Sequence, residues 1–289
     1  MTSITKAVIP AAGWGTRFLP MTKAQPKEML PVVDKPVIQY VVEEAVRSGC
    51  DDILIITGRN KRAIEDHFDA SLELDLHLRN GSNASLAREC EALKDLANIH
   101  YIRQKEPKGL GDAIFHARYH CRDEPFAVLL GDTICIPHDG AVECTKQMID
   151  VYHKFQRSVI VVEEVPDEKI SDYGIIAAQK IDDSTYEVTD IVEKPSLAAA
   201  PSHLGAIGRY LLTPDIFSLL AKAKPGYNGE IQLTDTLRQL ERPLGIITKC
   251  TRYDIGDKPG WMQSNIELTM MHPVFGSIIS DVFTSKRYK

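Results

Sequence analysis

Short apolar runs alternate with amphipathic stretches along the first half of the chain. The runs cover residues 7–9, 53–56, 99–104 and 126–130, and each has the length of one buried strand. Between the first two runs, residues 36–49 place their apolar side chains on one helical face, with a proline in the first turn and a glycine at the end. Strands that alternate with helices predict a parallel sheet covered by helices on both faces.

The second half of the chain is richer in predicted strands. Residues 173–176 and 186–193 flank the polar sequence Asp182-Asp183-Ser184, which predicts a β-hairpin. The other expected elements are helices at 140–155, 215–221, 231–241 and 258–271, and strands at 158–165, 204–212 and 244–253. No internal repeat or linker separates the halves, so we expect residues 1–289 to form one domain around a shared sheet.

Residues 69–98 do not fit the strand and helix alternation. Their polar pattern indicates one helix, a break at Asn80-Gly81 and a second helix from Ser85. We expect this segment to lie outside the main sheet, as an arm or lid.

Composition and charge exclude several classes of protein. A net charge of −6 and a pI of about 5.9 argue against nucleic-acid binding. No apolar run approaches the ~18 residues of a membrane span, and the first ten residues show no signal-peptide pattern. The six cysteines are scattered without a Cys-x-x-Cys pair, which disfavours a metal site or a disulfide framework. We therefore expect a cytoplasmic protein without a membrane partner.

Positive charge is concentrated in the first 35 residues. Five Lys and Arg stand there against two acids, a balance of +3 in a chain whose total is −6. The small residues Gly13 and Gly15 let backbone N–H groups approach an anion closely, and Arg17 and Lys27 supply cations. Phe18 occupies the place of the third glycine of a dinucleotide fingerprint, and no Walker A Gly-Lys-Ser/Thr is present. We therefore expect a polyphosphate site of another kind, and not an NAD site.

Further polar residues follow other predicted strands. Residues 104–111 come after the third strand, and Asp132 comes after the fourth. Ligands of parallel sheets bind at the carboxyl ends of the strands. We therefore expect these residues and the glycine-rich loop to form one site.

The succession Gly15-Thr16-Arg17 and then PKEMLP at 26–31 resembles the signature of sugar-nucleotide pyrophosphorylases. The longer stretch PKEMLPVVDKPVIQYVVEE is similar to that of bacterial-type UTP–glucose-1-phosphate uridylyltransferases. The resemblance implies a Rossmann-like nucleotidyltransferase fold of class α/β, with a central, mostly parallel mixed sheet flanked by helices and a β-rich sugar-binding portion. It also implies a nucleotide-binding portion of about 1–135, a sugar-phosphate-binding portion of about 136–260 and a C-terminal helical segment of about 258–289.

The reaction that this resemblance implies is transfer of a uridylyl group from UTP to glucose 1-phosphate, giving UDP-glucose and pyrophosphate with Mg²⁺ as cofactor. No Ser/His/Asp arrangement or Gly-x-Ser-x-Gly motif is present, so we expect direct in-line attack without a covalent enzyme intermediate. The resemblance further implies a homo-oligomer, either a dimer or a tetramer. Two alternatives stay open: a glucose-1-phosphate thymidylyltransferase, and a non-catalytic regulatory paralogue that binds sugar nucleotides. The second predicts damage to Gly15-Thr16-Arg17, which is intact.

The resemblance also assigns catalytic roles. Arg17 and Lys27 would contact the triphosphate and the charge that develops at the α-phosphate, with Asp132 and Lys194 completing the catalytic set. Asp132 and Asp254 would hold Mg²⁺, a cation that prefers carboxylate and phosphate oxygens. Asp257 is the less suited alternative to Asp254.

The remaining assignments concern the two substrates. Gly174, Glu193 and Lys194 would bind the sugar phosphate, and the Gln104 amide suits the uracil edge because it can both donate and accept. Relatives commonly carry a histidine after Lys-Gly-Leu-Gly, where this chain has Asp112. The nucleotide-binding set is Ala11, Ala12, Gly13, Gly15, Thr16, Glu28, Gln104 and Gly109.

Overall fold

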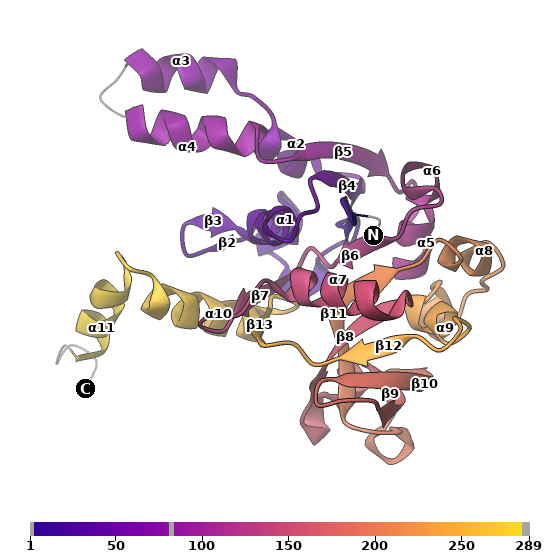
Figure 1. The fold of residues 1–289 in the computed structure, drawn as a ribbon. Helices are drawn as coiled ribbons and strands as arrows, with labels where there is room; N and C mark the ends of the chain where they lie inside the picture. The colour runs from indigo at the N-terminus through magenta and orange to yellow at the C-terminus, as the bar shows by residue number, and fades with distance from the viewer. Residues whose placement is uncertain (1–2, 81–83, 285–289) are drawn as a thin grey trace.

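A single large sheet lies at the centre of the computed structural model, which describes residues 3–80 and 84–284 (Figure 1). Within those residues the sheet has nine strands in the order β5-β4-β1-β6-β11-β8-β12-β10-β9. Their bounds are β1 Lys6–Pro10, β4 Asp52–Thr57, β5 Asn98–Arg103, β6 Phe126–Leu129, β8 Val159–Glu164, β9 Gly174–Lys180, β10 Thr185–Glu193, β11 Leu204–Leu212 and β12 Leu244–Ile246.

The direction of strand pairing changes across the sheet. β5, β4, β1 and β6 come from the first half of the chain and pair in parallel. β11 runs antiparallel to both β6 and β8, β12 is parallel to β8, and β9 and β10 form an antiparallel hairpin. The predicted mixed α/β sheet is therefore confirmed, and the second half of the chain extends the sheet that the first half begins.

Helices cover both faces of this sheet. α1 Val37–Arg47 and α7 Cys144–Phe155 lie on one face, and α5 Leu110–Phe115, α6 Arg118–Cys121, α8 Ile216–Leu220 and α9 Leu233–Leu237 lie on the other. The alternation of strand side chains explains the two layers, because Ala7 and Ile9 pack with Ile38 of α1 whereas Val8 packs with Ile114 of α5.

The segment that did not fit the alternation forms an arm. After α2 Arg62–Phe68, helices α3 Leu72–Asn80 and α4 Ala84–Lys94 lie side by side and project beyond the edge strand β5 (Figure 1). The structure agrees with two helices outside the main sheet. The expected break begins at Asn80, and residues 81–83 lie outside the described part of the chain.

A second, two-stranded sheet packs beside the large one. β7 Thr133–Pro137 pairs antiparallel with β13 Cys250–Asp254. The prediction of one strand over 244–253 was therefore wrong: β12 belongs to the large sheet, whereas β13 belongs to the small one. Backbone bonds explain the division, because Ile247 N donates to Ser184 O while His138 N donates to Lys249 O.

The C-terminal helices complete the fold. β2 Pro31–Val32 and β3 Lys35–Pro36 form a small hairpin, and α10 Lys258–Met271 and α11 Gly276–Thr284 follow β13. Phe18, Tyr253 and Leu268 meet in a third core, which joins the glycine-rich loop to β13 and α10. The helical segment was expected to reach residue 289, and residues 285–289 lie outside the described part. None of the described helices combines the length and the apolar character that crossing a bilayer requires.

Candidate active site

The loop after β1 is held in shape by hydrogen bonds and by one glycine. Ala11 N donates to Ile56 O at 2.9 Å, and Thr22 Oγ1 donates to Gly15 O at 2.7 Å. Gly15 has a φ of 66°, and a Cβ there would approach both Lys27 Cβ and Thr22 Cγ2 to 3.3 Å. Only glycine meets both conditions without strain. The turn then leads into the 3-10 helix η1 Thr16–Phe18, which Phe18 anchors in the core.

Lys27 and Asp132 form an ion pair across 105 residues of sequence. Lys27 begins the 3-10 helix η3 Lys27–Met29, and its Nζ lies 2.5 Å from Asp132 Oδ2. Burial acts to lower the pKa of Lys27, but the charges of Asp132 and Glu28 outweigh it and raise that pKa above its ordinary value. Burial likewise acts to raise the pKa of Asp132, and the adjacent Lys27 reverses this and lowers it. Both side chains are therefore charged at neutral pH.

The two predicted metal ligands lie at the same end of the small sheet. Asp254 is the last residue of β13 and stands opposite Thr133, the residue after Asp132. Ile255 N also donates to Asp132 O at 2.9 Å, which fixes the two chain segments against each other. The β7–β13 pairing therefore brings together carboxylates that are 122 positions apart in the sequence.

A buried arginine supports the turn that carries Asp132. Arg209 is fully buried in β11, and its Nη2 donates to Glu44 Oε2 at 2.8 Å and to Thr133 O at 2.7 Å. Its Nη1 donates to Leu130 O at 3.4 Å. The guanidinium thus bonds the backbone on both sides of Asp132, so the carboxylate is positioned from beneath. From the sequence, the stretch Ala206–Leu212 with Arg209 resembles the family pattern, but it indicated no role for this side chain.

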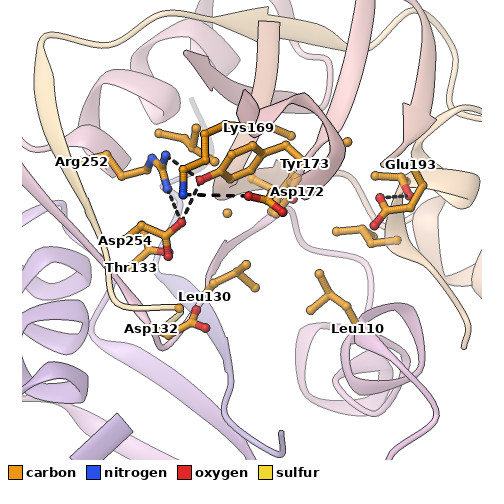
Figure 2. Close-up of a pocket in the computed structure, with 18 of the residues that line it drawn as sticks. Leu110, Leu130, Asp132, Thr133, Lys169, Asp172, Tyr173, Glu193, Arg252 and Asp254 are labelled. Carbon is orange, nitrogen blue, oxygen red and sulfur yellow. Dashed lines mark hydrogen bonds and ion pairs between the residues drawn. The ribbon is translucent and has the colours of Figure 1, made fainter. Parts of the chain in front are cut away.

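Asp132 and Asp254 line one cavity of about 210 Å³ (Figure 2). Tyr173 Oη donates to Asp254 Oδ2 at 2.8 Å, and Arg252 Nη1 donates to the same oxygen at 2.9 Å. Burial raises the pKa of Tyr173 to about 12, so the phenol remains a donor at neutral pH. Arg17 also lines this cavity. Tyr173 and Arg252 were not predicted as site residues, because neither belongs to a sequence motif of fixed spacing.

Asp257, the alternative to Asp254, caps a helix. It is the N-cap of α10, and its Oδ1 accepts from Gly260 N at 2.8 Å. This cap satisfies a backbone donor of the first helical turn. Asp257 also lines the cavity, and what favours Asp254 as the candidate ligand is its place opposite Thr133 in the β7–β13 pair, next to Asp132.

The far wall of the same cavity holds two of the three residues expected at the sugar phosphate. Glu193 lines it, and its Oε2 accepts from Thr234 Oγ1 at 2.8 Å. Gly174 also lines it, and a Cβ there would come within 2.6 Å of Thr234 Cγ2. Lys194 lies at the exposed margin with a φ of 45°, and its Nζ is 3.9 Å from Glu193 Oε1. It is adjacent to the cavity wall without being among the residues that line it.

A second cavity of about 420 Å³ lies on the other side of the glycine-rich loop. It is lined by Ala12, Gly13 and Thr16 of that loop, and by Gln104 at the end of β5. Lys61 also lines it, and its Nζ lies 2.7 Å from Oε2 of the buried Glu28. Four of the eight predicted nucleotide-binding residues, Ala12, Gly13, Thr16 and Gln104, therefore line this cavity. Lys61 lines it as well and was not predicted from the sequence.

Two of the predicted nucleotide-binding residues pack behind or beside this cavity and are not among the residues that line it. Ala11 is buried directly behind the loop. Gly109 has a φ of 104° and packs against Ile231, where a Cβ would come within 2.7 Å of the Ile231 carbonyl oxygen. Its own carbonyl oxygen accepts from Gln104 Nε2 at 3.4 Å.

Neighbouring residues of the glycine-rich loop line different cavities. Thr16 lines the larger cavity, and its neighbour Arg17 lines the smaller one. Pro26 lines the larger cavity, and Lys27 pairs with Asp132 of the smaller one. A ligand that extended from one cavity to the other past this loop would therefore lie close to Arg17 and Lys27. Among residues 3–80 and 84–284, no group of three or more His, Cys, Asp or Glu side chains could hold a metal ion unaided.

Known proteins resemble this chain over most of its length. The family model described as nucleotidyl transferase matches residues 6–264. The chain is 53% identical over 273 residues to the UTP–glucose-1-phosphate uridylyltransferase YngB of Bacillus subtilis, covering 93% of this chain and 91% of that protein. Among solved structures, it is similar to a UTP-bound UGPase from Acinetobacter baumannii, with a TM-score of 0.90, 34% identity, and coverage of 99% of this chain and 100% of that one. A UDP-glucose pyrophosphorylase complexed with UDP-glucose gives a TM-score of 0.86 at 44% identity, with coverage of 93% and 100%.

Proposed function

Because the chain belongs to the nucleotidyl transferase family, we propose that its two neighbouring cavities carry out one reaction, the transfer of a uridylyl group from UTP to glucose 1-phosphate. The products are UDP-glucose and pyrophosphate. The observation that carries the proposal is the Lys27–Asp132 pair: Lys27 follows Pro26, which lines the cavity that holds Gln104, and Asp132 lines the cavity that holds Glu193. The chain is thus an enzyme, a UTP–glucose-1-phosphate uridylyltransferase, and not a non-catalytic paralogue.

The residues of the larger cavity hold UTP in this proposal. Gln104 meets the uracil edge, and Ala12 and Gly13 lie against the nucleoside. The backbone around Gly15 and Thr16 faces the triphosphate, and Lys61 with Glu28 supports the loop from below. The α-phosphate then lies beside Arg17 and Lys27, whose positive charges stabilise the charge that develops there.

The smaller cavity holds glucose 1-phosphate. Glu193 accepts hydrogen bonds from sugar hydroxyls, and Gly174 lets the sugar approach the backbone closely. Lys194 reaches from the margin to the phosphate. One oxygen of that phosphate then attacks the α-phosphate of UTP in line, and positioning supplies most of the rate because both reactants are held together. No nucleophilic side chain is required.

Asp132 and Asp254 are suited to a divalent cation, which we propose is Mg²⁺. The donor set fits because both are carboxylates, both line the cavity, and they stand at the same end of the β7–β13 pair. When bound, the ion would neutralise phosphate charge. Arg252 and Tyr173 hold the Asp254 carboxylate in place, and Lys27 does the same for Asp132. A homo-oligomeric state and a cytoplasmic location stay predictions.

Substitution of Lys194 should separate the two substrates. Lys194→Ala is expected to raise the KM for glucose 1-phosphate about tenfold or more, because a charge-assisted contact to phosphate is lost. The KM for UTP should change little. Lys180→Ala, an exposed lysine in the same hairpin, is the matched control and should leave both constants unchanged. If the KM for UTP rises and the KM for glucose 1-phosphate does not, Lys194 contacts UTP and not the sugar phosphate.

The relative use of UTP and dTTP tests whether the chain is a uridylyltransferase or a thymidylyltransferase. Uracil and thymine differ by one methyl group, which is worth roughly 1–3 kcal/mol of discrimination in a pocket. We therefore expect preference without exclusion: UTP is used best, dTTP slowly, and purine triphosphates scarcely, because a two-ring base overfills the cavity. The measurement is kcat/KM for each triphosphate at saturating glucose 1-phosphate. A higher value for dTTP would make the chain a thymidylyltransferase.

A further inference from the structure

Gln104 is fixed at the end of β5, where the base is expected to bind. Its backbone N donates to Thr57 O at 2.8 Å, and only 5% of the residue is exposed. It lines the larger cavity together with Ala12 and Gly13. The sheet therefore fixes the position of Gln104. The orientation of its amide decides whether the oxygen or the –NH₂ group faces the cavity.

Asp112 is held beside it by a separate set of contacts. It lies in the first turn of α5, whose first residues Leu110 and Gly111 continue the loop from Lys108. That loop is joined to Ile231 by two backbone bonds, Ile231 N to Lys108 O at 2.7 Å and Gly111 N to Ile231 O at 2.8 Å. Because a side chain at Gly109 or Gly111 would collide with Ile231, the loop packs closely there. Asp112 is thus placed by the chain as firmly as Gln104.

The contact between these two side chains orients the amide. Gln104 Nε2 donates to Asp112 Oδ2 at 2.6 Å and lies 3.4 Å from Gly109 O. A carboxylate and a carbonyl oxygen only accept hydrogen bonds, so the –NH₂ end of the amide must face them. His116 also faces Asp112, with its Nδ1 3.8 Å from Oδ2 and 2.8 Å from the backbone oxygen. The reversed amide would place its oxygen against two acceptors.

We propose that Asp112 is a positioning residue that sets the selection of the base by holding the Gln104 amide oxygen toward it. An oxygen in that position accepts from the ring N–H at position 3 of uracil or thymine. Cytosine has an unprotonated nitrogen at that position, and two acceptors repel each other. The Gln104–Asp112 pair therefore selects a pyrimidine with a ring donor. This inference rests on the proposed function, because it takes the larger cavity as the site of UTP.

The test is the ratio of kcat/KM for UTP to that for CTP, at saturating glucose 1-phosphate, in Asp112→Asn and Asp112→Ala. An asparagine can either accept from Gln104 or donate to it, so both amide orientations become available. We expect the UTP-to-CTP ratio to fall about tenfold in Asp112→Asn and to fall in Asp112→Ala as well. The KM for glucose 1-phosphate should stay unchanged. Asp183→Asn, the same substitution at a fully exposed carboxylate, should keep the wild-type ratio.

A double-mutant cycle with Gln104→Ala separates positioning from a general structural effect. Once Gln104 is removed, Asp112→Asn should change the ratio no further. An unchanged ratio in both Asp112 variants, or equal effects of Asp112→Asn with and without Gln104, would overturn the proposal. A wild-type protein that does not use UTP would instead refute the proposed function, so the two failures are distinguishable. If one of the two Asp112 variants does not fold, the UTP-to-CTP ratio of the other variant still tests the proposal.

Discussion

Asp132→Asn is expected to lose most of its turnover, by roughly 10³-fold, at every Mg²⁺ concentration. Two contributions are lost together. An amide is a poorer ligand than a carboxylate for a hard cation, and Lys27 loses the partner that holds its Nζ 2.5 Å from Asp132. Added Mg²⁺ cannot restore either contribution. The measurement is kcat as a function of Mg²⁺ concentration, alongside thermal unfolding to show that the variant is folded.

Two neighbouring carboxylates provide the comparison. Asp254→Asn should reduce kcat in the same way, because Asp254 lines the same cavity and lies next to Asp132 at the end of the β7–β13 pair. Asp257→Asn should keep most of its turnover, since asparagine is as good an N-cap as aspartate for α10. A near-wild-type kcat in Asp132→Asn would show that Asp132 is not a metal ligand. A larger loss of kcat in Asp257→Asn than in Asp254→Asn would show that Asp257, and not Asp254, is the second ligand.

Arg17→Ala should lower kcat by roughly 10²-fold or more, while the KM for glucose 1-phosphate changes little. Arg17 follows the glycine turn and lines the smaller cavity beside Asp132 and Asp254. Its charge is proposed to act on the α-phosphate mainly in the transition state, so its removal affects turnover more than binding. Steady-state kinetics with each substrate varied in turn measure the two effects separately.

The control for Arg17 is Arg62→Ala, an exposed arginine on α2 whose side chain pairs only with Asp66 of the same helix among the described contacts. It should leave kcat unchanged. If Arg17→Ala raised a KM and kept kcat, Arg17 would contribute to binding alone and its assignment to the transition state would be wrong.

Most elements of the fold could be predicted because local pattern determines them. The apolar run at 7–9 is fully buried in β1, and the amphipathic stretch that ends at Gly49 forms α1. The prediction for residues 244–253 failed for a physical reason: no proline or glycine stands between Ile246 and Cys250, so nothing local shows that the chain leaves one sheet for another there. Only the backbone bonds to Ser184 and His138 divide the segment.

The candidate site was predictable in its residue types more than in its contacts. Sequence pattern placed Asp132 at a strand end and Lys27 in a basic loop, but their pairing depends on the meeting of β7, β13 and η3. Tyr173 and Arg252 could not be selected in advance, because their roles arise from hydrogen bonds to Asp254 across the fold. The same holds for Lys61 and Arg209, whose partners lie far away in the sequence.

The most direct test of direct uridylyl transfer follows the α-phosphate of UTP. The purified protein would be incubated with Mg²⁺ and UTP labelled with ³²P at the α-position, with and without glucose 1-phosphate. We predict that the label enters UDP-glucose only when glucose 1-phosphate is present, with an equal amount of pyrophosphate released and none of the label bound to protein. Label on the protein, pyrophosphate release without the sugar phosphate, or no UDP-glucose at all would contradict the account.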